Sequence, residues 1–201
     1  NTYNGVAIIS NKELIDVQFD ISNFHDEQKR LISGIYPNDE GPKFRVISAY
    51  IPNGQSLNSD KFEYKINWLK SFISSLQKKI DGVENIITGD FNIAPTKLDC
   101  YDSKSWDGKI LVSPQEREYF DKLLNLGFID TFREMNPYAN EFSWWDYRIP
   151  FKRNLGMRID HILLSKNLLT FLKKAYIDKT TRTLERPSDH VPVVTELSLN
   201  P

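Results

Sequence analysis

Cysteine, long apolar runs and an excess of either charge are what this 201-residue chain has least of. Its one cysteine, Cys100, excludes an internal disulfide framework and a zinc site built from several cysteines. No apolar run reaches the roughly 18 residues that cross a bilayer, and the polar start at residues 1–4 is unlike a signal peptide. These absences predict a soluble, cytoplasmic protein without a membrane partner.

The charge balance also excludes a globally basic protein. The formal net charge is −1, so affinity for nucleic acid would have to come from local patches. Hydrophobic residues make up 40% of the chain and aromatic residues 12%, which is enough for a packed core. Because no repeat or linker interrupts the chain, we expect one domain over residues 1–201.

Hydrophobic periodicity predicts a mixed α/β protein. Helical spacing indicates an amphipathic helix over 59–80, with Lys65 among its polar residues, and a capping box at Ser113 to Glu116 starts a second helix that runs to Gly127. A third helix is expected at about 165–174. Apolar or alternating runs predict strands at 5–10, 14–19, 31–36, 44–50, 85–88, 159–164 and 191–199. This order favours an α/β sandwich with its functional loops at one edge.

Three short polar strings next to predicted strands carry the chemistry. Gly89-Asp90-Phe91-Asn92 follows a strand, Ser188-Asp189-His190 precedes one, and Arg158-Ile159-Asp160-His161 lies at the head of another. They offer carboxylate, carboxamide and imidazole groups without an activated serine or cysteine. Each string alone is also typical of a turn, a cap or a salt bridge. Together they indicate metal-assisted hydrolysis by water.

Hydrolysis of a phosphodiester requires a cation, a positioned water and donors for the phosphoryl oxygens. Asp90 and Asp189 can supply oxygen ligands for magnesium, or one of them can accept the proton of the water. Asp160 can orient His190, which then acts either as a cationic donor or as a base, and the sequence leaves both roles open.

Other polar side chains near predicted strand ends complete this set. Asn53 and Asn92 can donate hydrogen bonds to a phosphate, and Tyr50 adds a hydroxyl group. His25 and His161 receive no role, because no chemical grouping surrounds them in the sequence.

The chain resembles the exonuclease III family of DNA repair enzymes, within the wider endonuclease/exonuclease/phosphatase superfamily. The matching strings follow one another in family order and span nearly the whole chain. They are residues 50–54, 89–96, 130–133, 142–148, 158–161 and 187–190. The Asp-Thr-Phe-Arg string at 130–133 and the Ser-Trp-Trp-Asp-Tyr-Arg string at 143–148 favour a bacterial-type repair nuclease over a lipid or inositol phosphatase.

The resemblance implies a four-layer α/β sandwich, in which two mixed β-sheets are flanked by helices. It implies a Mg²⁺-dependent enzyme, with Mn²⁺ as an alternative, that removes nucleotides from 3′ ends of duplex DNA and cleaves 5′ to abasic sites. The expected partners are double-stranded DNA and abasic-site DNA, and the expected state is a monomer.

The resemblance also assigns roles to residues. It implies that Asp90 activates the attacking water, that Asp189, Asp90 and Asn92 form the metal site, and that His190 is the essential histidine with Asp160 as its orienting acid. Tyr50, Asn92 and Asn53 would contact phosphate, and Trp144 and Met157 would flank the pocket for an extruded abasic sugar. A phosphate-binding surface is expected from Arg148, Lys152, Arg153, Arg158, Arg182 and Arg186.

In one respect the chain departs from the family pattern. Family members begin with a further segment that carries an Asn-Gly string and then a Gln-Glu string, whose glutamate is the principal metal ligand. This chain starts beyond both, so we expect an N-terminally incomplete domain that lacks its first strands and binds magnesium weakly. The alternatives are a catalytically impaired DNA-binding fragment of such an enzyme and a phosphatase that acts on small phosphate esters.

Overall fold

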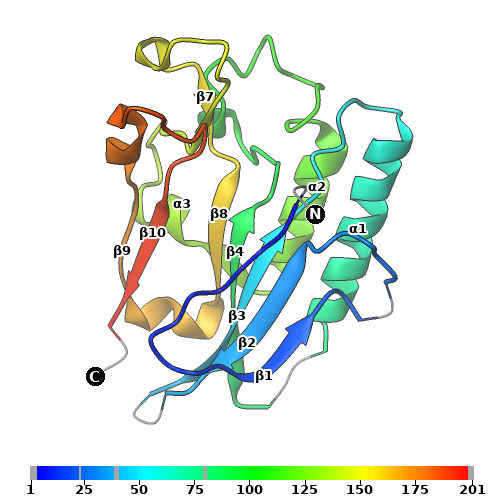
Figure 1. The fold of residues 1–201 in the computed structure, drawn as a ribbon, viewed down its shortest axis with the longest axis vertical. Helices are drawn as coiled ribbons and strands as arrows, with labels where there is room; N and C mark the ends of the chain where they lie inside the picture. The colour runs from blue at the N-terminus through cyan, green and yellow to red at the C-terminus, as the bar shows by residue number, and fades with distance from the viewer. Residues whose placement is uncertain (1–3, 23, 39–40, 79–80, 199–201) are drawn as a thin grey trace.

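The computed structural model describes residues 4–22, 24–38, 41–78 and 81–198, and its centre is a six-stranded sheet (Figure 1). The strands lie in the order β1-β2-β3-β4-β8-β5. β3 and β4 run parallel, whereas the other neighbouring pairs of this sheet are antiparallel. These strands are β1 (Ile15–Phe19), β2 (Leu31–Tyr36), β3 (Lys43–Tyr50), β4 (Val83–Asp90), β5 (Phe128–Asp130) and β8 (Asp160–Ser165).

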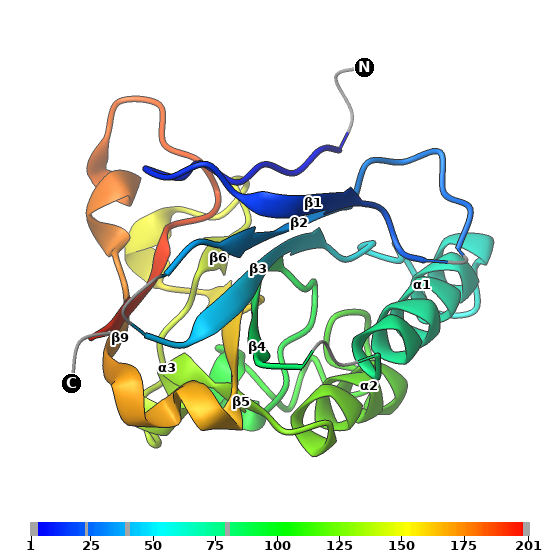
Figure 2. The same cartoon turned by 90° about the horizontal axis from the view of Figure 1, so that it is seen from below.

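Two helices, α1 (Asp60–Leu76) and α2 (Pro114–Asn125), lie together on one side of this sheet (Figure 2). α1 is the crossover that allows β3 and β4 to run parallel. Both helices begin at a serine cap, and α2 has the predicted capping box between Ser113 and Glu116. Their apolar faces pack on the sheet and form the largest core cluster, which includes Ile47, Trp68, Leu69, Phe72, Ile87, Phe120, Leu123 and Leu163.

A second sheet lies on the opposite side of the central sheet from α1 and α2 (Figure 2). It consists of the antiparallel strands β9 (Leu172–Ile177) and β10 (Val193–Leu197), and the short helix α3 (Thr131–Met135) contacts both β8 and β9. The predicted arrangement of sheets flanked by helices is therefore confirmed. Among the described residues, however, the second sheet is antiparallel and two-stranded rather than mixed. A further short pair joins β6 (Trp144–Trp145) to β7 (Gly156–Met157).

The strand predicted at residues 5–10 is wrong, because this segment forms neither helix nor strand. Its branched residues favour an extended chain, and the side chain of Ile9 is 98% exposed. A strand requires a hydrogen-bonding neighbour, and the structure gives the segment no place in any of its sheets.

The helix predicted at 165–174 is also wrong. A 3-10 helix, η3 (Lys166–Phe171), begins there but gives way to β9 at Leu172. Pairing with β10 overrides local helical preference, with Ile177 opposite Val193 and Ala175 opposite Thr195. The remaining 3-10 helices are η1 (Lys97–Asp99), η2 (Phe151–Arg153) and η4 (Lys179–Thr183).

The other predicted elements are confirmed apart from their ends. The helix expected over 59–80 ends at Leu76, and the one expected to reach Gly127 ends at Asn125. Ile80 and Leu199, the predicted ends of a helix and a strand, lie outside the described residues. None of the helices in the described part of the chain combines the length and the apolar character needed to cross a membrane.

The close approach of β3 to β4 at Gly89 is open to a direct test. Gly89 has a φ of 138°, and an added Cβ would overlap the carbonyl oxygen of Ala49. Gly82→Ala is the matched control, because Gly82 also has a positive φ but nothing lies within 4 Å of an added Cβ. We expect Gly89→Ala to lower the free energy of unfolding by about 1–3 kcal/mol more than the control does. Urea denaturation measures both, and equal effects would contradict the close approach.

Candidate active site

Two acidic residues from distant parts of the sequence meet at the ends of two inner strands of the central sheet. β4 ends at Asp90 and β8 begins at Asp160, and the antiparallel register of these strands sets the two residues opposite each other. The strand ends that the polar strings flank are therefore neighbours in space, as the sequence analysis expected.

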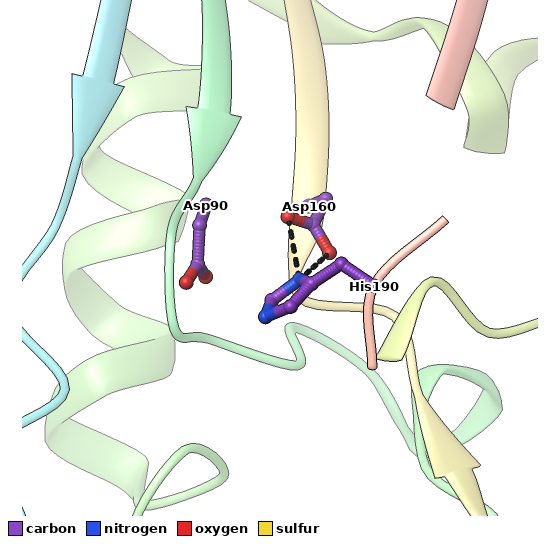
Figure 3. A group of neighbouring side chains, drawn as sticks. All are labelled: Asp90, Asp160 and His190. Atoms are coloured by element: carbon purple, nitrogen blue, oxygen red, sulfur yellow. Dashed lines mark hydrogen bonds and ion pairs between the residues drawn. The ribbon is translucent and has the colours of Figure 1, made fainter. Parts of the chain in front are cut away.

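His190 joins this pair from the segment that precedes β10. Its Nδ1 atom lies 2.9 Å and 3.1 Å from the two carboxylate oxygens of Asp160. Burial lowers the pKa of His190, but the hydrogen bond to Asp160 and the negative charges around the ring outweigh it and raise the pKa to about 9. Figure 3 shows the opposite edge of the imidazole turned toward Asp90.

The environment of Asp90 makes its carboxyl group unusually basic. Burial and the charge of Asp160 raise its pKa to about 7, against the opposing effects of His190, the Asn92 N–H and Lys65. Ligand atoms of Asp90, Asp160 and His190 all lie within 4.8 Å of one another. The two carboxylates at this spacing fit a divalent cation, whose charge would relieve the repulsion between them.

Asn92 is held against the carboxylate of Asp90 by hydrogen bonds. Its backbone N–H donates to Asp90 Oδ1 at 2.8 Å, and its Nδ2 donates to Asp90 Oδ2 at 3.0 Å and to the carbonyl of Ile51 at 3.0 Å. Its Oδ1 accepts from Asn53 Nδ2 at 2.8 Å. The backbone of Asn92 is in the left-handed region, at φ 50°, which turns the chain sharply after β4. The predicted residues Asn53, Asn92 and Asp90 are thus linked by direct hydrogen bonds.

Asp189 lies beside this cluster rather than within it. Its carboxylate accepts a hydrogen bond from Trp144 Nε1 at 3.0 Å, and its charge contributes to the raised pKa of His190. Among the described residues it is not part of the group that could hold a metal ion. Trp144 itself is half-buried, and its backbone forms an isolated antiparallel β-bridge with that of His190. Met157, which pairs with Trp144, is fully buried and offers no surface in this structure.

Tyr50 lies at the end of β3, opposite Asp90 in the register of β3 and β4. The guanidinium of Arg30 stacks 4.7 Å from the centre of its ring. Arg30 is 4% exposed and also donates to the backbone carbonyl of Tyr50. Sequence reasoning missed this arginine, which directly precedes the neighbouring strand β2 and carries no motif of its own.

Two of the arginines expected on a phosphate-binding surface are instead buried, and that prediction is wrong for them. Arg158 is 0% exposed and donates to both carboxylate oxygens of Asp130 and to Asp99. Arg182 is 8% exposed and stacks on the ring of Phe151 at 5.0 Å. Planar guanidinium groups suit such buried pairing and stacking. The other members, Arg148, Lys152, Arg153 and Arg186, are exposed, and Arg148 forms an ion pair with Asp146.

His161, to which the sequence analysis assigned no role, supports the loop after Asn92. Its Nδ1 accepts from Arg158 at 3.0 Å, so the Nε2 atom carries the proton and donates to the carbonyl of Ile93 at 2.9 Å. Burial and the charge of Arg158 lower the pKa of His161 to about 4, and the ring is therefore neutral.

Lys65 was predicted on the polar face of its helix, and this is wrong. It is fully buried and pairs with Glu116, the capping-box residue of α2. Its Nζ also donates to the carbonyl of Asn92 at 2.7 Å and to that of Asn53 at 3.3 Å. Helical spacing could have predicted this burial. Lys65 follows Phe62 by three positions and precedes Leu69 by four, so it lies on the same buried face of the helix.

Comparisons with known proteins identify the family of the chain. Residues 1–190 match the model of the Endonuclease/Exonuclease/phosphatase family. The chain belongs to this family. Exodeoxyribonuclease III of Haemophilus influenzae is 37% identical over 96% of this chain and 76% of its own length. The chain thus spans about three quarters of this relative, and the predicted resemblance is confirmed.

Solved structures of the same family have the same fold. The 3′ phosphatase NExo from Neisseria, bound to a product DNA hairpin, has a TM-score of 0.88 and 39% identity over 94% of this chain and 73% of its own. An AP endonuclease from Archaeoglobus fulgidus has a TM-score of 0.86 and 31% identity over 94% of this chain and 72% of its own. These family members are all enzymes.

The pairing of His190 with Asp160 predicts a measurable shift. In an NMR titration of His190, we expect a pKa of about 9 in the unmodified protein, and Asp160→Asn should lower it by more than any other single carboxylate change. Asp189→Asn is the graded control, because Asp189 contributes only a weaker, purely electrostatic effect. A titration of His190 that is the same with and without the Asp160 carboxylate would contradict the geometry.

Burial of neutral His161 predicts a specific dependence of stability on pH. The folded pKa of about 4 lies below the ordinary 6.5, so the unfolded chain binds the extra proton first and stability falls as pH decreases through this interval. His161→Gln keeps a donor and an acceptor but does not titrate. Between about pH 7 and about pH 5, the unmodified protein should lose about 2 kcal/mol relative to this variant in urea denaturation. Parallel stability curves would show that His161 is accessible to protons in the folded state.

Proposed function

We propose that this chain hydrolyses phosphodiester bonds in duplex DNA with a Mg²⁺-activated water, acting at 3′ ends and 5′ to abasic sites. The observation that carries the proposal is the meeting of Asp90 with the His190–Asp160 pair at one rim of the sheet. A carboxylate that can take a proton at neutral pH thus lies beside a cation that can donate a hydrogen bond.

The surroundings of each side chain at the rim indicate its role in hydrolysis. Asp90 accepts the proton of the attacking water. Burial and Asp160 raise its pKa to about 7 in the metal-free protein, and a bound cation would lower it. His190, with a pKa of about 9, is an imidazolium at neutral pH, which favours the donor role over the base role that the sequence left open. Asp160 holds the ring in place. A divalent cation held by Asp90 and its neighbours would neutralise the phosphate and lower the pKa of the water.

The substrate assignment draws on groups around the rim. Asn53 and the Tyr50 hydroxyl donate to phosphoryl oxygens, and Asp189 adds negative charge for the metal. Asn92 instead holds Asp90, because both of its Nδ2 hydrogens are already used by Asp90 and Ile51. Trp144 stacks beside an extruded abasic sugar, which leaves the duplex at lower cost because it has no base to unstack. The exposed cations Arg148, Lys152, Arg153 and Arg186 bind the DNA backbone. The repair enzymes among its relatives, exodeoxyribonuclease III and AP endonucleases, support DNA as the polymer.

One set of labelled duplexes of identical sequence tests the proposal. The duplexes carry an abasic analogue, a recessed 3′ hydroxyl or a 3′ phosphate, the last because the 39% identical NExo is described as a 3′ phosphatase. We expect hydrolysis that requires Mg²⁺ and stops with EDTA. Asp90→Asn and His190→Asn should each reduce the rate by about 10²–10⁴-fold, whereas the exposed control Glu118→Gln should leave it unchanged.

Other outcomes would reject the proposal in distinguishable ways. Tight, salt-dependent binding of the abasic duplex without hydrolysis at any Mg²⁺ concentration would identify a DNA-binding module without turnover. Faster hydrolysis of a small phosphate ester than of any duplex would identify a phosphatase of the same family.

A further inference from the structure

One buried ammonium group contacts both loops at the rim, the loop with Asn53 and the loop with Asn92. Lys65 Nζ has three acceptors around it: the carbonyl of Asn92 at 2.7 Å, the carbonyl of Asn53 at 3.3 Å and the carboxylate of Glu116. An ammonium has three N–H donors, so all of them are used. The Lys65 side chain is 0% exposed, and water therefore cannot replace these contacts.

The two carbonyls belong to loops beyond the end of the β3–β4 pairing, whose last registered pair is Tyr50 and Asp90. Asn53 follows β3, and Asn92 follows β4. Their carboxamides nevertheless touch, with Asn53 Nδ2 donating to Asn92 Oδ1 at 2.8 Å, and Asn92 in turn donates twice to Asp90. Lys65 Nζ donates to the backbone carbonyls of both asparagines, while their carboxamides form the hydrogen bonds that reach Asp90.

Glu116 fixes the ammonium group in turn. Its Oε2 accepts from the backbone and hydroxyl of Ser113, and its Oε1 accepts from Lys65 and from the backbone N–H of Leu111. A single carboxylate thus caps helix α2 and anchors the lysine of helix α1. The backbones of Asn53 and Asn92 are thereby connected, through Lys65 and Glu116, to the two helices that pack on the core.

We infer that Lys65, anchored by Glu116, is a positioning residue that sets the geometry of Asn53, Asn92 and Asp90 for hydrolysis. The inference rests on the proposed function for its effect on the reaction. It assigns Lys65 no contact with the substrate. Its consequence is that loss of the ammonium lets the two loops separate, so the chemical step slows while the exposed cations still bind DNA.

The experiment separates positioning from stability by removing the buried charge in two ways. Lys65→Met leaves Glu116 unpaired and the protein destabilised. The double variant Lys65→Met/Glu116→Gln removes both charges, keeps an acceptor for the Ser113 cap and should regain most of the lost thermal stability. Leu69→Ala, at another fully buried position on the same face of α1, controls for general loosening of the helix.

We expect both Lys65 variants to lower kcat by about 10²-fold with little change in KM, and the double variant to remain slow although it is stable. Leu69→Ala should keep the unmodified kcat once assayed below its melting temperature. Recovery of kcat in the double variant would overturn the inference, because it would show that Lys65 acts only through stability.

A second readout does not depend on activity. In NMR spectra of the protein without metal or DNA, the Nδ2 protons of Asn92 should exchange slowly, because they are held between Asp90 and Ile51. Both Lys65 variants should speed this exchange, and Leu69→Ala should not. Unchanged exchange would overturn the inference. An unmodified protein that fails to cleave DNA would instead reject the proposed function and leave this readout to decide the role of Lys65.

Discussion

The antiparallel pairing of β4 with β8 is the constraint on which the site depends. It sets the last residue of one strand, Asp90, opposite the first residue of the other, Asp160. Two carboxylates forced into proximity in a partly dry place raise the pKa of one of them, and the same charge attracts the imidazolium of His190. The strand register thus determines both the geometry and the electrostatics of the rim.

Buried charges hold the loops around this rim, and each is satisfied by hydrogen bonds. Arg158 links Asp99 and Asp130 and fixes the tautomer of His161, which holds the carbonyl of Ile93. Lys65 and Glu116 do the same for the loops of Asn53 and Asn92. Removal of one partner from such a buried pair typically costs about 3–5 kcal/mol, since the remaining charge is left in a dry interior. These networks connect the loops around the rim to the two helices and to the central sheet.

Most strands and both long helices could be predicted from periodicity and caps, and the serine cap with Glu116 was predicted to the residue. The errors share a cause. Residues 5–10 lack a partner strand, and 172–177 gain one in β10, so pairing between distant segments decided against the local pattern. The motif strings located the Asp90, Asp160 and His190 cluster, but no string revealed that Arg158 and Arg182 are buried, because a charged residue in a motif looks the same whether it faces solvent or an acid.

The sequence by itself determined the kinds of chemical group available and the strands beside which they lie, because local patterns of apolar residues, glycines and caps show where strands and helices are. Only the tertiary structure decided which charges face one another. Lys65 and Arg30 carry no motif, and His161 received no role although it ends the 158–161 string. The roles of all three follow from groups that other segments bring to them. The pKa values of Asp90 and His190 likewise arise from burial and from neighbours distant in the chain, and these depend on how the whole chain packs.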